Sequence, residues 1–456
     1  MYNPNLHFHF TGIGGVGMSG IAEVLLHQGF QVSGSDLVAN DACARLEQLG
    51  AVISQGHSFE NLPVEASLLV YSSAVPQDNP ELVAARERGI PVVPRAEVLA
   101  ELMRLKFGIA VAGSHGKTST TSMIAHILEE NDLDPTVIIG GQVKTKDKSG
   151  GRLGKGEFLV AESDESDRSF LLLKPSIAIV TNIDSEHLEA YSSMSDLEQC
   201  FEQFLHSVPF YGLAVLCVDD ARVRKIAEFY SRRKITYGFS PDAELRIENY
   251  QSNGTSICFD VVLHDQHQAT IDLPMLGKHM AQNALAAIAV ALELGLSIKS
   301  ISKALQSFPG IKRRLEIIGQ KNGTTVMSDY GHHPTEIKAT LSALQASSYG
   351  EGDIHVIFQP HRYTRTKDCF ADFLNSFEAC DSLIVTDIHA ASEKPIEGIS
   401  GEELCKAITH ESKAFNSDFG SIASQVAASA KPGDLVICFG AGSIGKLPNL
   451  ILDQMG

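Results

Sequence analysis

One short stretch, residues 107–121, restricts the fold of this chain more than any other part of the sequence. The apolar run 107–112 predicts a buried strand, and apolar side chains recur at helical spacing after position 119. A strand, a glycine turn, a lysine and a hydroxyl at a helix start bind phosphate, because backbone N–H groups, the helix dipole and the lysine surround the anion. We therefore predict a phosphate-binding loop made of Gly113, Ser114, His115, Gly116, Lys117, Thr118 and Ser119.

This loop departs from the standard pattern G-x-x-x-x-G-K-[ST]. Val111 stands where the first glycine is expected, so the motif that remains is G-x-x-G-K-T-S. A bare GKT is common by chance, but GKTSTT between a buried strand and an amphipathic helix is much rarer. We keep the interpretation as a nucleotide loop, with an ordinary strand–turn–helix as the alternative.

Length and charge limit the possible classes of protein. A chain of 456 residues predicts about three domains. The net charge of −18 argues against general binding to nucleic acid or to an anionic membrane. The 8 cysteines are scattered and form no C-x-x-C pair, which is typical of reduced thiols in the cytosol. No export signal and no apolar run of about 18 residues is apparent, so we expect a cytoplasmic protein.

A second glycine loop lies near the start of the chain. Residues 6–11 predict a strand, Gly12 to Gly17 form G-x-G-x-x-G, residues 18–27 predict a helix, and a strand at 31–35 is followed by Asp36. Alone, this βαβ pattern predicts an NAD-dependent oxidoreductase. Its glycines let the backbone approach any diphosphate, so a UDP-linked ligand fits equally well. Ser72 ends a further strand at the edge where open α/β sheets bind ligands.

Polar side chains also follow the strands after the phosphate loop. A strand at 158–161 ends in Glu162, and a buried strand at 176–181 leads to His187. We expect both at the edge that carries the phosphate loop, where a carboxylate can hold Mg²⁺. His279 and Asn283 precede an alanine-rich helix at 284–294 and, four residues apart, share a helical face.

A third α/β unit is predicted after Phe308-Pro309-Gly310, with strands at 325–329, 354–359, 382–386 and 435–439. Two loops after these strands are rich in His, Tyr and Arg, as expected where a small anionic ligand binds. A solvated basic turn is the alternative for the second loop. The residues concerned are Asp329, Tyr330 and His332 in the first loop and His361, Arg362 and Arg365 in the second.

Two nucleotide-type loops and three α/β units favour one class of reaction. An oxidoreductase needs only the first loop, and a simple ATPase needs only the second. A ligase that uses ATP to join two substrates needs sites for ATP, for a carboxylate and for a nucleophile. Phosphoryl transfer to the carboxylate makes an acyl phosphate, which an amine can then attack.

The motifs TGIGGVGMSGIA, GSHGKTST, AESDESDRSF, TNIDSEHLEAY, GKHMAQNALAA, RRLE, SDYGHHPTEI and PHRYTR occur in this order. Together they resemble the Mur ligase family of peptidoglycan synthesis, most closely its branch that joins L-alanine to UDP-N-acetylmuramate. The resemblance implies an α/β fold of three domains: an N-terminal Rossmann-like domain (1–106) for the UDP-linked substrate, a central P-loop ATPase-type mixed sheet (107–309) for ATP, and a C-terminal Rossmann-like domain (310–456) for the amino acid. It also implies Mg²⁺, small-molecule substrates only, and a monomer or homodimer.

The resemblance further implies roles for individual residues. Lys117, Glu162 and His187 would be catalytic, and Thr118, Glu162 and His187 would bind metal. Beyond the phosphate loop, His279, Asn283, Arg314 and Asp329 would contact ATP. The amino acid would be bound by Tyr330, His332, His361, Arg362 and Arg365. The UDP-linked substrate would be bound by Gly14, Gly15, Val16, Gly17, Met18, Ser19, Asp36 and Ser72.

One departure and two alternatives accompany this prediction. Several sibling ligases carry a carbamylated lysine shortly after the His187 position, whereas residues 198–210 contain no lysine here. We expect Glu202 to supply the missing negative charge. A ligase that attaches a tripeptide to UDP-N-acetylmuramate is the alternative within the family. An NAD-dependent oxidoreductase is the alternative outside it, although it leaves the phosphate loop unexplained.

Overall fold

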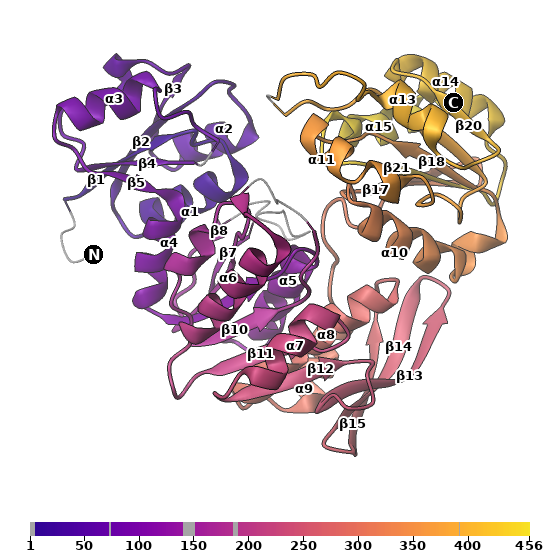
Figure 1. The fold of residues 1–456 in the computed structure, drawn as a ribbon, viewed down its shortest axis with the longest axis horizontal. Coiled ribbons are helices and arrows are strands. Elements are labelled where there is room, and N and C mark those ends of the chain that lie inside the picture. Colours follow the sequence, from indigo (N-terminus) through magenta and orange to yellow (C-terminus); the bar gives the residue numbers. More distant parts are fainter. Residues whose placement is uncertain (1–4, 73, 140–150, 186–189, 392) are drawn as a thin grey trace. The chain divides into compact units, whose positions relative to one another are not determined.

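The computed structural model describes residues 5–72, 74–139, 151–185, 190–391 and 393–456 (Figure 1). Three β-sheets follow one another along the chain, with five, ten and six strands. Helices alternate with the strands, and most strand pairs are parallel. The predicted α/β fold of three domains is therefore confirmed.

The first sheet has the order β3-β2-β1-β4-β5, and all of its strands are parallel. Its first strand is almost wholly buried, and this includes the polar residues His9 and Thr11. The strands are β1 (His7–Thr11), β2 (Gln31–Asp36), β3 (Val52–Gln55), β4 (Leu68–Tyr71) and β5 (Val92–Pro94). The helices are α1 (Val16–His27), α2 (Asp41–Gln48), α3 (Pro80–Glu87) and α4 (Arg95–Arg104).

The second sheet has the order β15-β14-β13-β12-β11-β10-β6-β9-β7-β8. Its parallel centre is formed by β6 (Phe107–Ala112), β9 (Phe158–Glu162), β10 (Ile177–Val180), β11 (Leu213–Cys217) and β12 (Lys234–Gly238). The other strands are β7 (Thr136–Ile138), β8 (Gly151–Arg152), β13 (Leu245–Asn253), β14 (Ser256–Leu263) and β15 (Gln266–Leu273). The helices are α5 (Lys117–Glu130), α6 (Met194–His206), α7 (Ala221–Phe229), α8 (Lys278–Glu293) and α9 (Ile298–Gln306), with a 3₁₀ turn η2 (Ser169–Leu172).

The third sheet has the order β16-β17-β21-β18-β19-β20, and only its β16–β17 pair is antiparallel. Its strands are β16 (Glu316–Lys321), β17 (Thr324–Asp329), β18 (Ile354–Phe358), β19 (Ser382–Val385), β20 (Lys413–Phe415) and β21 (Leu435–Phe439). Its helices are α10 (Pro334–Gln345), α11 (Tyr363–Asp368), α12 (Phe370–Phe373), α13 (Gly401–Ala407), α14 (Phe419–Ser429) and α15 (Leu447–Gln454). Two separate buried clusters pack around this sheet.

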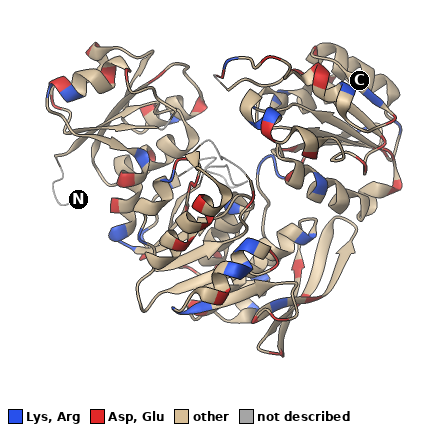
Figure 2. Cartoon of the chain, viewed as in Figure 1, with Lys and Arg blue, Asp and Glu red and all other residues tan. Residues whose placement is uncertain are grey.

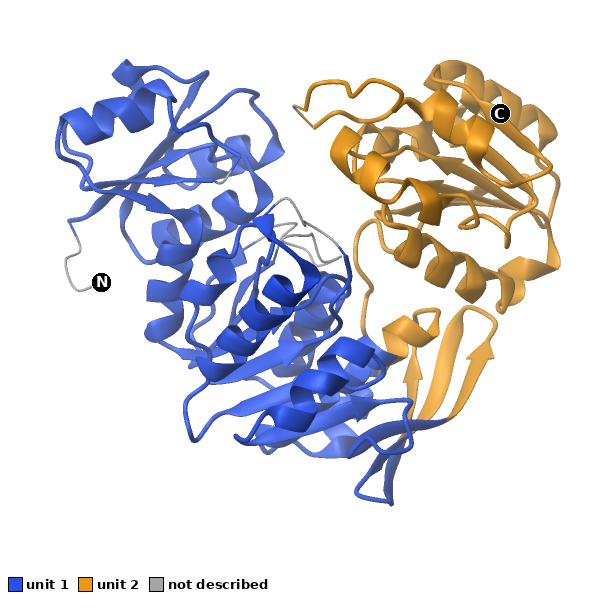
Figure 3. Cartoon of the chain, in the orientation of Figure 1, with its two compact units in different colours: residues 1–248, 261–269, 282–305 blue, residues 249–260, 270–281, 306–456 orange. Residues whose placement is uncertain are grey.

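Contacts group the chain into two compact units (Figure 3). Unit 1 comprises residues 1–248, 261–269 and 282–305, and unit 2 comprises residues 249–260, 270–281 and 306–456. Unit 1 contains the first sheet and most of the second because one buried cluster runs through both, from Phe10 to Met103 and on to Phe170 and Phe204. The domain boundaries expected at residues 106 and 309 remain a prediction.

Charged residues of both signs are distributed over both units (Figure 2). None of the helices in the described ranges has the length and apolar character needed to cross a lipid bilayer. All eight cysteines are free thiols, and seven of them are buried. Buried thiols outside disulfides are common in proteins from reducing compartments.

Candidate functional site

The predicted phosphate loop lies between β6 and α5 of unit 1. Gly113 has a φ of +132° and Gly116 a φ of +83°, backbone conformations that side chains disfavour. A Cβ on Gly113 would lie 2.1 Å from Thr181 Oγ1, and one on Gly116 would lie 2.6 Å from Asn283 Oδ1. Both glycines are therefore required by conformation and by close approach, which explains their place in the sequence.

Residues 181–184, which follow β10, fix the shape of this loop. The His115 N–H donates to Asn182 Oδ1 at 2.8 Å, and Thr181 Oγ1 donates to the His115 carbonyl at 2.6 Å. The Asp184 N–H donates to Ser114 Oγ at 2.8 Å, and the His115 ring lies 3.1 Å from the Asp184 carboxylate. Residues that follow β10 therefore hold the phosphate loop in place, so its backbone is preorganised for a ligand.

Lys117 opens α5 and points back into the loop. Its ammonium donates to the carbonyls of Gly113 at 2.5 Å and Ser114 at 3.1 Å, and to Glu165 Oε1 at 2.8 Å. The Glu165 side chain is only 2% exposed. Burial raises the pKa of Glu165 to about 7, although the charge of Lys117 opposes this. Sequence analysis assigned no role to Glu165, so this ion pair is a new element of the site.

Two oxygen donors suited to Mg²⁺ lie at the end of the second sheet that carries the phosphate loop. Thr118 is the second residue of α5, and Glu162 ends β9, where it is the register partner of Val111 on β6. A hydroxyl and a carboxylate are hard ligands of the type that Mg²⁺ prefers, so these two residues fit that ion. The third predicted ligand, His187, lies outside the described residues. Glu202 is exposed on α6, whose buried side carries Leu197, Cys200, Phe201, Phe204 and Leu205.

The first glycine loop lies between β1 and α1. Gly12 has a φ of +82°, and the N–H groups of Gly12 and Ile13 both donate to the Ser35 carbonyl, at 2.8 and 3.0 Å. The Gly14 N–H donates to Asp36 Oδ2 at 2.8 Å. A Cβ on Gly14 would lie 2.8 Å from Asn40 Nδ2 and 2.9 Å from Asp36 Oδ2. Asp36 therefore shapes the loop itself, in addition to the predicted place near a ligand.

The remaining predicted residues of this first site follow the same edge. Val16, Gly17, Met18 and Ser19 form the first turn of α1, and the Ser19 N–H donates to the Gly15 carbonyl at 2.8 Å. Ser72 follows β4, where its hydroxyl accepts a hydrogen bond from the Ala74 N–H at 3.4 Å. The structure therefore brings the loop, Asp36 and Ser72 to the carboxyl ends of β1, β2 and β4.

A buried glutamate lies beneath the first loop. Glu81, in the first turn of α3, is fully buried and accepts hydrogen bonds from Ser35 Oγ at 2.7 Å, Thr11 Oγ1 at 2.8 Å and Asn61 Nδ2 at 2.9 Å. His9 Nε2 lies 3.4 Å from the same carboxylate. Burial alone would raise the pKa of Glu81, but these hydrogen bonds outweigh it and lower the pKa to about 2. Sequence analysis missed this residue as well.

His279 and Asn283, both predicted to contact ATP, are one turn apart on α8. Asn283 is 6% exposed and lies against Gly116. Burial, followed by the positive charge of Arg314, lowers the pKa of His279 to about 4, so this ring is neutral near pH 7. Gly277, just before the helix, has a φ of +97°. The helix starts six residues earlier than position 284, where its alanine-rich part begins.

Arg314 and Asp329 belong to a partly buried ionic network in unit 2. Arg314 donates to Glu336 Oε1 at 3.0 Å, and the attraction of Glu336 and Asp329 raises its pKa against the effect of burial. Asp329 accepts the N–H groups of Leu315 at 2.8 Å and Gly331 at 2.7 Å, while burial raises its pKa. Asp329 thus fixes the backbone of the loop that follows β17.

The predicted amino-acid residues form one cluster in unit 2. The Tyr330 and His332 rings are 5.5 Å apart, and the His332 and His361 rings are 5.8 Å apart. Arg365 Nη1 lies 3.1 Å from His361 Nδ1. Arg362 has a φ of +67°, and its N–H donates to the His389 carbonyl at 2.9 Å. The two loops that the sequence predicted as an anion site are therefore brought together.

Three further residues, to which the motifs assigned no role, complete this cluster. The His389 ring stacks on His361 at 5.5 Å, and the guanidinium of Arg313 lies 5.0 Å from the Tyr330 ring centre. Glu336 accepts the His332 N–H at 3.1 Å. Burial, followed by the nearby His332, Arg365, Arg362 and His389, lowers the pKa of His361 to about 3, so its ring is neutral near pH 7.

Comparisons with known proteins match nearly the whole chain. Family models match residues 7–107 (Mur ligase family, catalytic domain), 111–291 (Mur ligase middle domain) and 313–442 (Mur ligase, glutamate ligase domain). The UDP-N-acetylmuramate–L-alanine ligase of Solidesulfovibrio magneticus is 50% identical over 450 residues, with 98% of each chain covered. That of Geobacter sp. strain M21 is 47% identical and covers 99% of this chain and 98% of its own.

Solved structures show the same likeness over the full length. The UDP-N-acetylmuramate–alanine ligase MurC of Thermotoga maritima superposes with a TM-score of 0.85 at 27% identity, and 99% of each chain is covered. A murein peptide ligase of Psychrobacter arcticus superposes with a TM-score of 0.73 at 25% identity, again with 99% of each chain covered.

Proposed function

Because the chain belongs to the Mur ligase family, we propose that it joins L-alanine to UDP-N-acetylmuramate in peptidoglycan precursor synthesis. The enzyme is an ATP-dependent amide-forming ligase, and its products are UDP-N-acetylmuramoyl-L-alanine, ADP and phosphate. The full-length identity of 50% to an L-alanine ligase carries this assignment. The phosphate loop supports it, because ATP-driven ligation needs a site for the transferred phosphoryl group.

The first chemical step uses the residues of unit 1. The muramate carboxylate attacks the γ-phosphorus, an oxygen–phosphorus bond forms, and the bond to ADP breaks, which leaves an acyl phosphate. The Lys117 ammonium donates to Gly113, Ser114 and Glu165, so we expect it to exchange at least one of these partners for the phosphate when ATP binds. Its positive charge then stabilises the negative charge that develops on the transferred group.

A divalent cation completes this site in our proposal. Thr118 and Glu162 would hold Mg²⁺, with His187 as the third ligand, and the ion would neutralise charge on the phosphates. His279 and Asn283 would contact the adenine, and Arg314 and Asp329 would contact the nucleotide. The loop from Gly14 to Ser19, together with Asp36 and Ser72, would bind the diphosphate and uridine of the other substrate.

The second step uses the cluster in unit 2. The alanine amine attacks the acyl carbon, the carbon–nitrogen bond forms, and phosphate leaves. Arg362 and Arg365 would pair with the alanine carboxylate, because a guanidinium presents two parallel donors to a carboxylate. Tyr330, His332 and His361 would enclose the small side chain. The lowered pKa of His361 keeps its ring neutral beside these arginines, so the cluster does not accumulate a further positive charge.

We also propose a cytoplasmic location and a monomer or homodimer that acts without nucleic acid or membrane. The free thiols of all eight cysteines and the dependence on ATP support the location.

The direct test is phosphate release by the purified protein with Mg-ATP and UDP-N-acetylmuramate. We expect release only when L-alanine is added, and alanine-independent release or none at all would contradict the proposal. The similarity to a murein peptide ligase makes tripeptide attachment the second candidate. A competition between alanine and tripeptide distinguishes the two, and we expect alanine to be incorporated.

A further inference from the structure

The turn between β9 and η2 contacts Arg95 of α4 and Lys117 of the phosphate loop through two adjacent acidic residues. Asp164 Oδ2 lies 3.1 Å from Arg95 Nη2, and Glu165 Oε1 lies 2.8 Å from Lys117 Nζ. Two neighbouring carboxylates therefore connect to two different cations.

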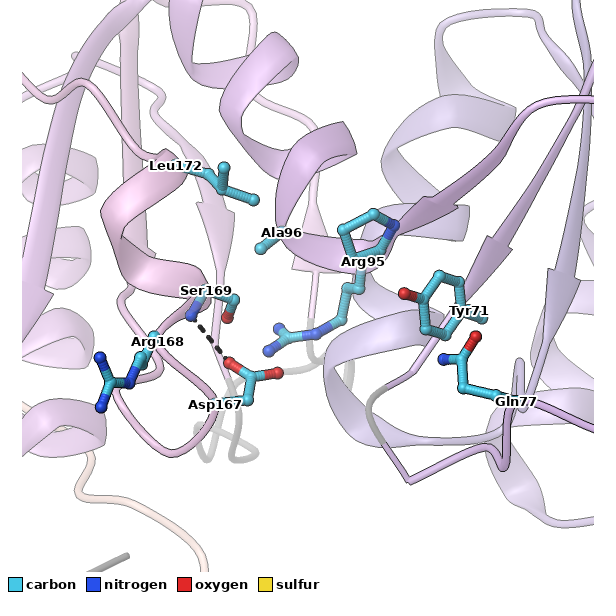
Figure 4. Close-up of a pocket in the computed structure, with 9 residues that line it drawn as sticks. Tyr71, Gln77, Arg95, Ala96, Asp167, Arg168, Ser169 and Leu172 are labelled. Carbon is cyan, nitrogen blue, oxygen red and sulfur yellow. Dashed lines mark hydrogen bonds between the residues drawn. The ribbon is translucent and has the colours of Figure 1, made fainter. Parts of the chain in front are cut away.

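Arg95 brings the first of these contacts to the first glycine loop. It is the first residue of α4, and a Cβ on Gly17 would lie 2.6 Å from Arg95 Nη1. The guanidinium thus rests against the first turn of α1, where Gly17 lacks a side chain. Figure 4 shows Arg95 extending toward the turn, on the wall of a cavity of about 430 Å³ that Tyr71 and Arg168 also line.

Hydrogen bonds to neighbouring elements brace the backbone of the turn that carries both carboxylates. The Ser163 N–H donates to the Val111 carbonyl of β6 at 2.8 Å, and the Phe170 N–H donates to the Asp164 carbonyl at 3.2 Å. The Tyr191 hydroxyl donates to the Glu165 carbonyl. Arg168, with a φ of +63°, donates to the Ala190 carbonyl at 2.9 Å through Nε. A turn held at these points has little freedom to bend between Asp164 and Glu165.

We propose that this turn couples the two nucleotide sites, with Asp164 and Glu165 as positioning residues. A ligand on the first loop displaces α1 and Arg95, the Arg95–Asp164 ion pair shifts the turn, and Glu165 then changes the position of Lys117. The inference rests on the proposed function, because it requires the first loop to bind the UDP-linked substrate and the second to bind ATP. By linkage, each ligand must change the affinity for the other by the same factor.

The test measures this factor by calorimetry on the full chain. The magnesium complex of a non-hydrolysable ATP analogue is titrated without and with saturating UDP-N-acetylmuramate, in the absence of alanine. For the wild type we expect an affinity change of about 5-fold or more, in the range typical of coupled sites. Asp164→Asn should bind the analogue alone as the wild type does, yet show a factor below about twofold. Glu165→Gln should lose the coupling and bind the analogue differently even alone.

Controls separate coupling from a general loss of structure. Glu101 lies on the same helix as Arg95 and forms an exposed ion pair with Arg104, with 2.9 Å between Glu101 Oε1 and Arg104 Nη1. Glu101→Gln removes this pair and should keep the wild-type coupling factor. If Asp164→Asn fails to fold, Arg95→Lys takes its place in the test. This substitution keeps the positive charge but loses the planar guanidinium group, so it should also reduce the factor by which one ligand changes the affinity for the other. Two results would overturn the coupling inference but leave the proposed function intact. One is wild-type protein that binds both ligands without coupling, and the other is Asp164→Asn with the wild-type coupling factor. Wild-type protein that binds neither ligand would overturn the proposed function, and the inference with it.

Discussion

The two glycine loops of unit 1 rest on buried glutamates in contrasting environments. Beneath the first loop, Glu81 is surrounded by hydroxyl, amide and imidazole donors, and its pKa is lowered to about 2 although burial acts in the opposite direction. Beside the second loop, Glu165 contacts one lysine, and burial raises its pKa to about 7. The first carboxylate is permanently ionised near neutral pH, whereas the second is held close to its titration point.

This difference indicates different tasks. Glu81 is bound by Ser35, whose carbonyl in turn accepts the Gly12 and Ile13 N–H groups, so it stabilises the resting shape of the first loop. Glu165 instead holds a lysine that must change partners when phosphate arrives. A buried carboxylate with a full set of hydrogen-bond donors is suited to a fixed structural role. A buried carboxylate with only one charged partner is suited to hold a group that moves. The predictions below test this contrast.

We expect the largest effect on activity at Lys117, the lysine that changes partners when phosphate binds. Lys117→Ala removes the charge that stabilises the transferred phosphoryl group, and kcat should fall about 10³-fold or more. Steady-state phosphate release measures this loss, and the thermal unfolding midpoint checks that the fold is intact. A loss below about tenfold would remove Lys117 from the catalytic role and weaken the contrast between the two loops.

The sequence predicted the parts of this fold that depend on local pattern. The apolar runs of β6 and β21 coincide with the predicted strands at 107–112 and 435–439, because a continuous buried strand bounded by glycine is distinctive. The short strands β7 and β20 have three residues each, too few to show a period. The start of α8 was predicted late because its first turn carries polar residues.

The site was predictable where a motif fixes both residue type and position. Lys117 and the glycines around it are defined by the strand–turn–helix motif, and the His and Arg loops are defined by their place after strands. Glu165 was not found because residues 162–167 contain four acids, and the sequence does not say which of them faces the lysine. Glu81 follows Asn79-Pro80 and has the sequence signature of an ordinary helix start, so its burial depends on residues far along the chain.

The second prediction concerns Glu81, which stabilises the resting shape of the first glycine loop. The pKa of Glu81 is lower in the folded than in the unfolded protein, so its contribution is complete above pH 4.5 and is lost as the pH falls toward 2. Glu81→Gln should therefore lower the free energy of unfolding at pH 7 by about 3 kcal/mol. Urea unfolding at pH 7 and pH 3 measures the loss, which should shrink at the lower pH. Glu87→Gln, an exposed change on the same helix, should have little effect.

The third prediction concerns the cluster of His, Tyr and Arg residues in unit 2, which contains neither glycine loop. Arg362→Ala removes a charge-assisted hydrogen bond to the alanine carboxylate, and the KM for alanine should rise about 10- to 100-fold. The KM values for ATP and UDP-N-acetylmuramate should stay close to those of the wild type. Lys367→Ala, an exposed change on α11, controls for loss of positive charge. An unchanged KM for alanine would move the amino-acid site elsewhere.

The smallest effect, and the sharpest test of the contrast, is a difference of sign. The pKa of Glu165 is higher in the folded than in the unfolded protein, so its contribution to stability is present below pH 4.5 and is lost as the pH rises through about 7. Relative to Glu165→Gln, the wild type should therefore lose up to about 2 kcal/mol of unfolding free energy between pH 5 and pH 8. Relative to Glu81→Gln, the wild type should instead gain stability as the pH rises, between pH 2 and 4.5. If urea unfolding gave both glutamates the same sign of pH dependence, the two loops would rest on equivalent carboxylates, and the distinction between a fixed and a moving support would fail.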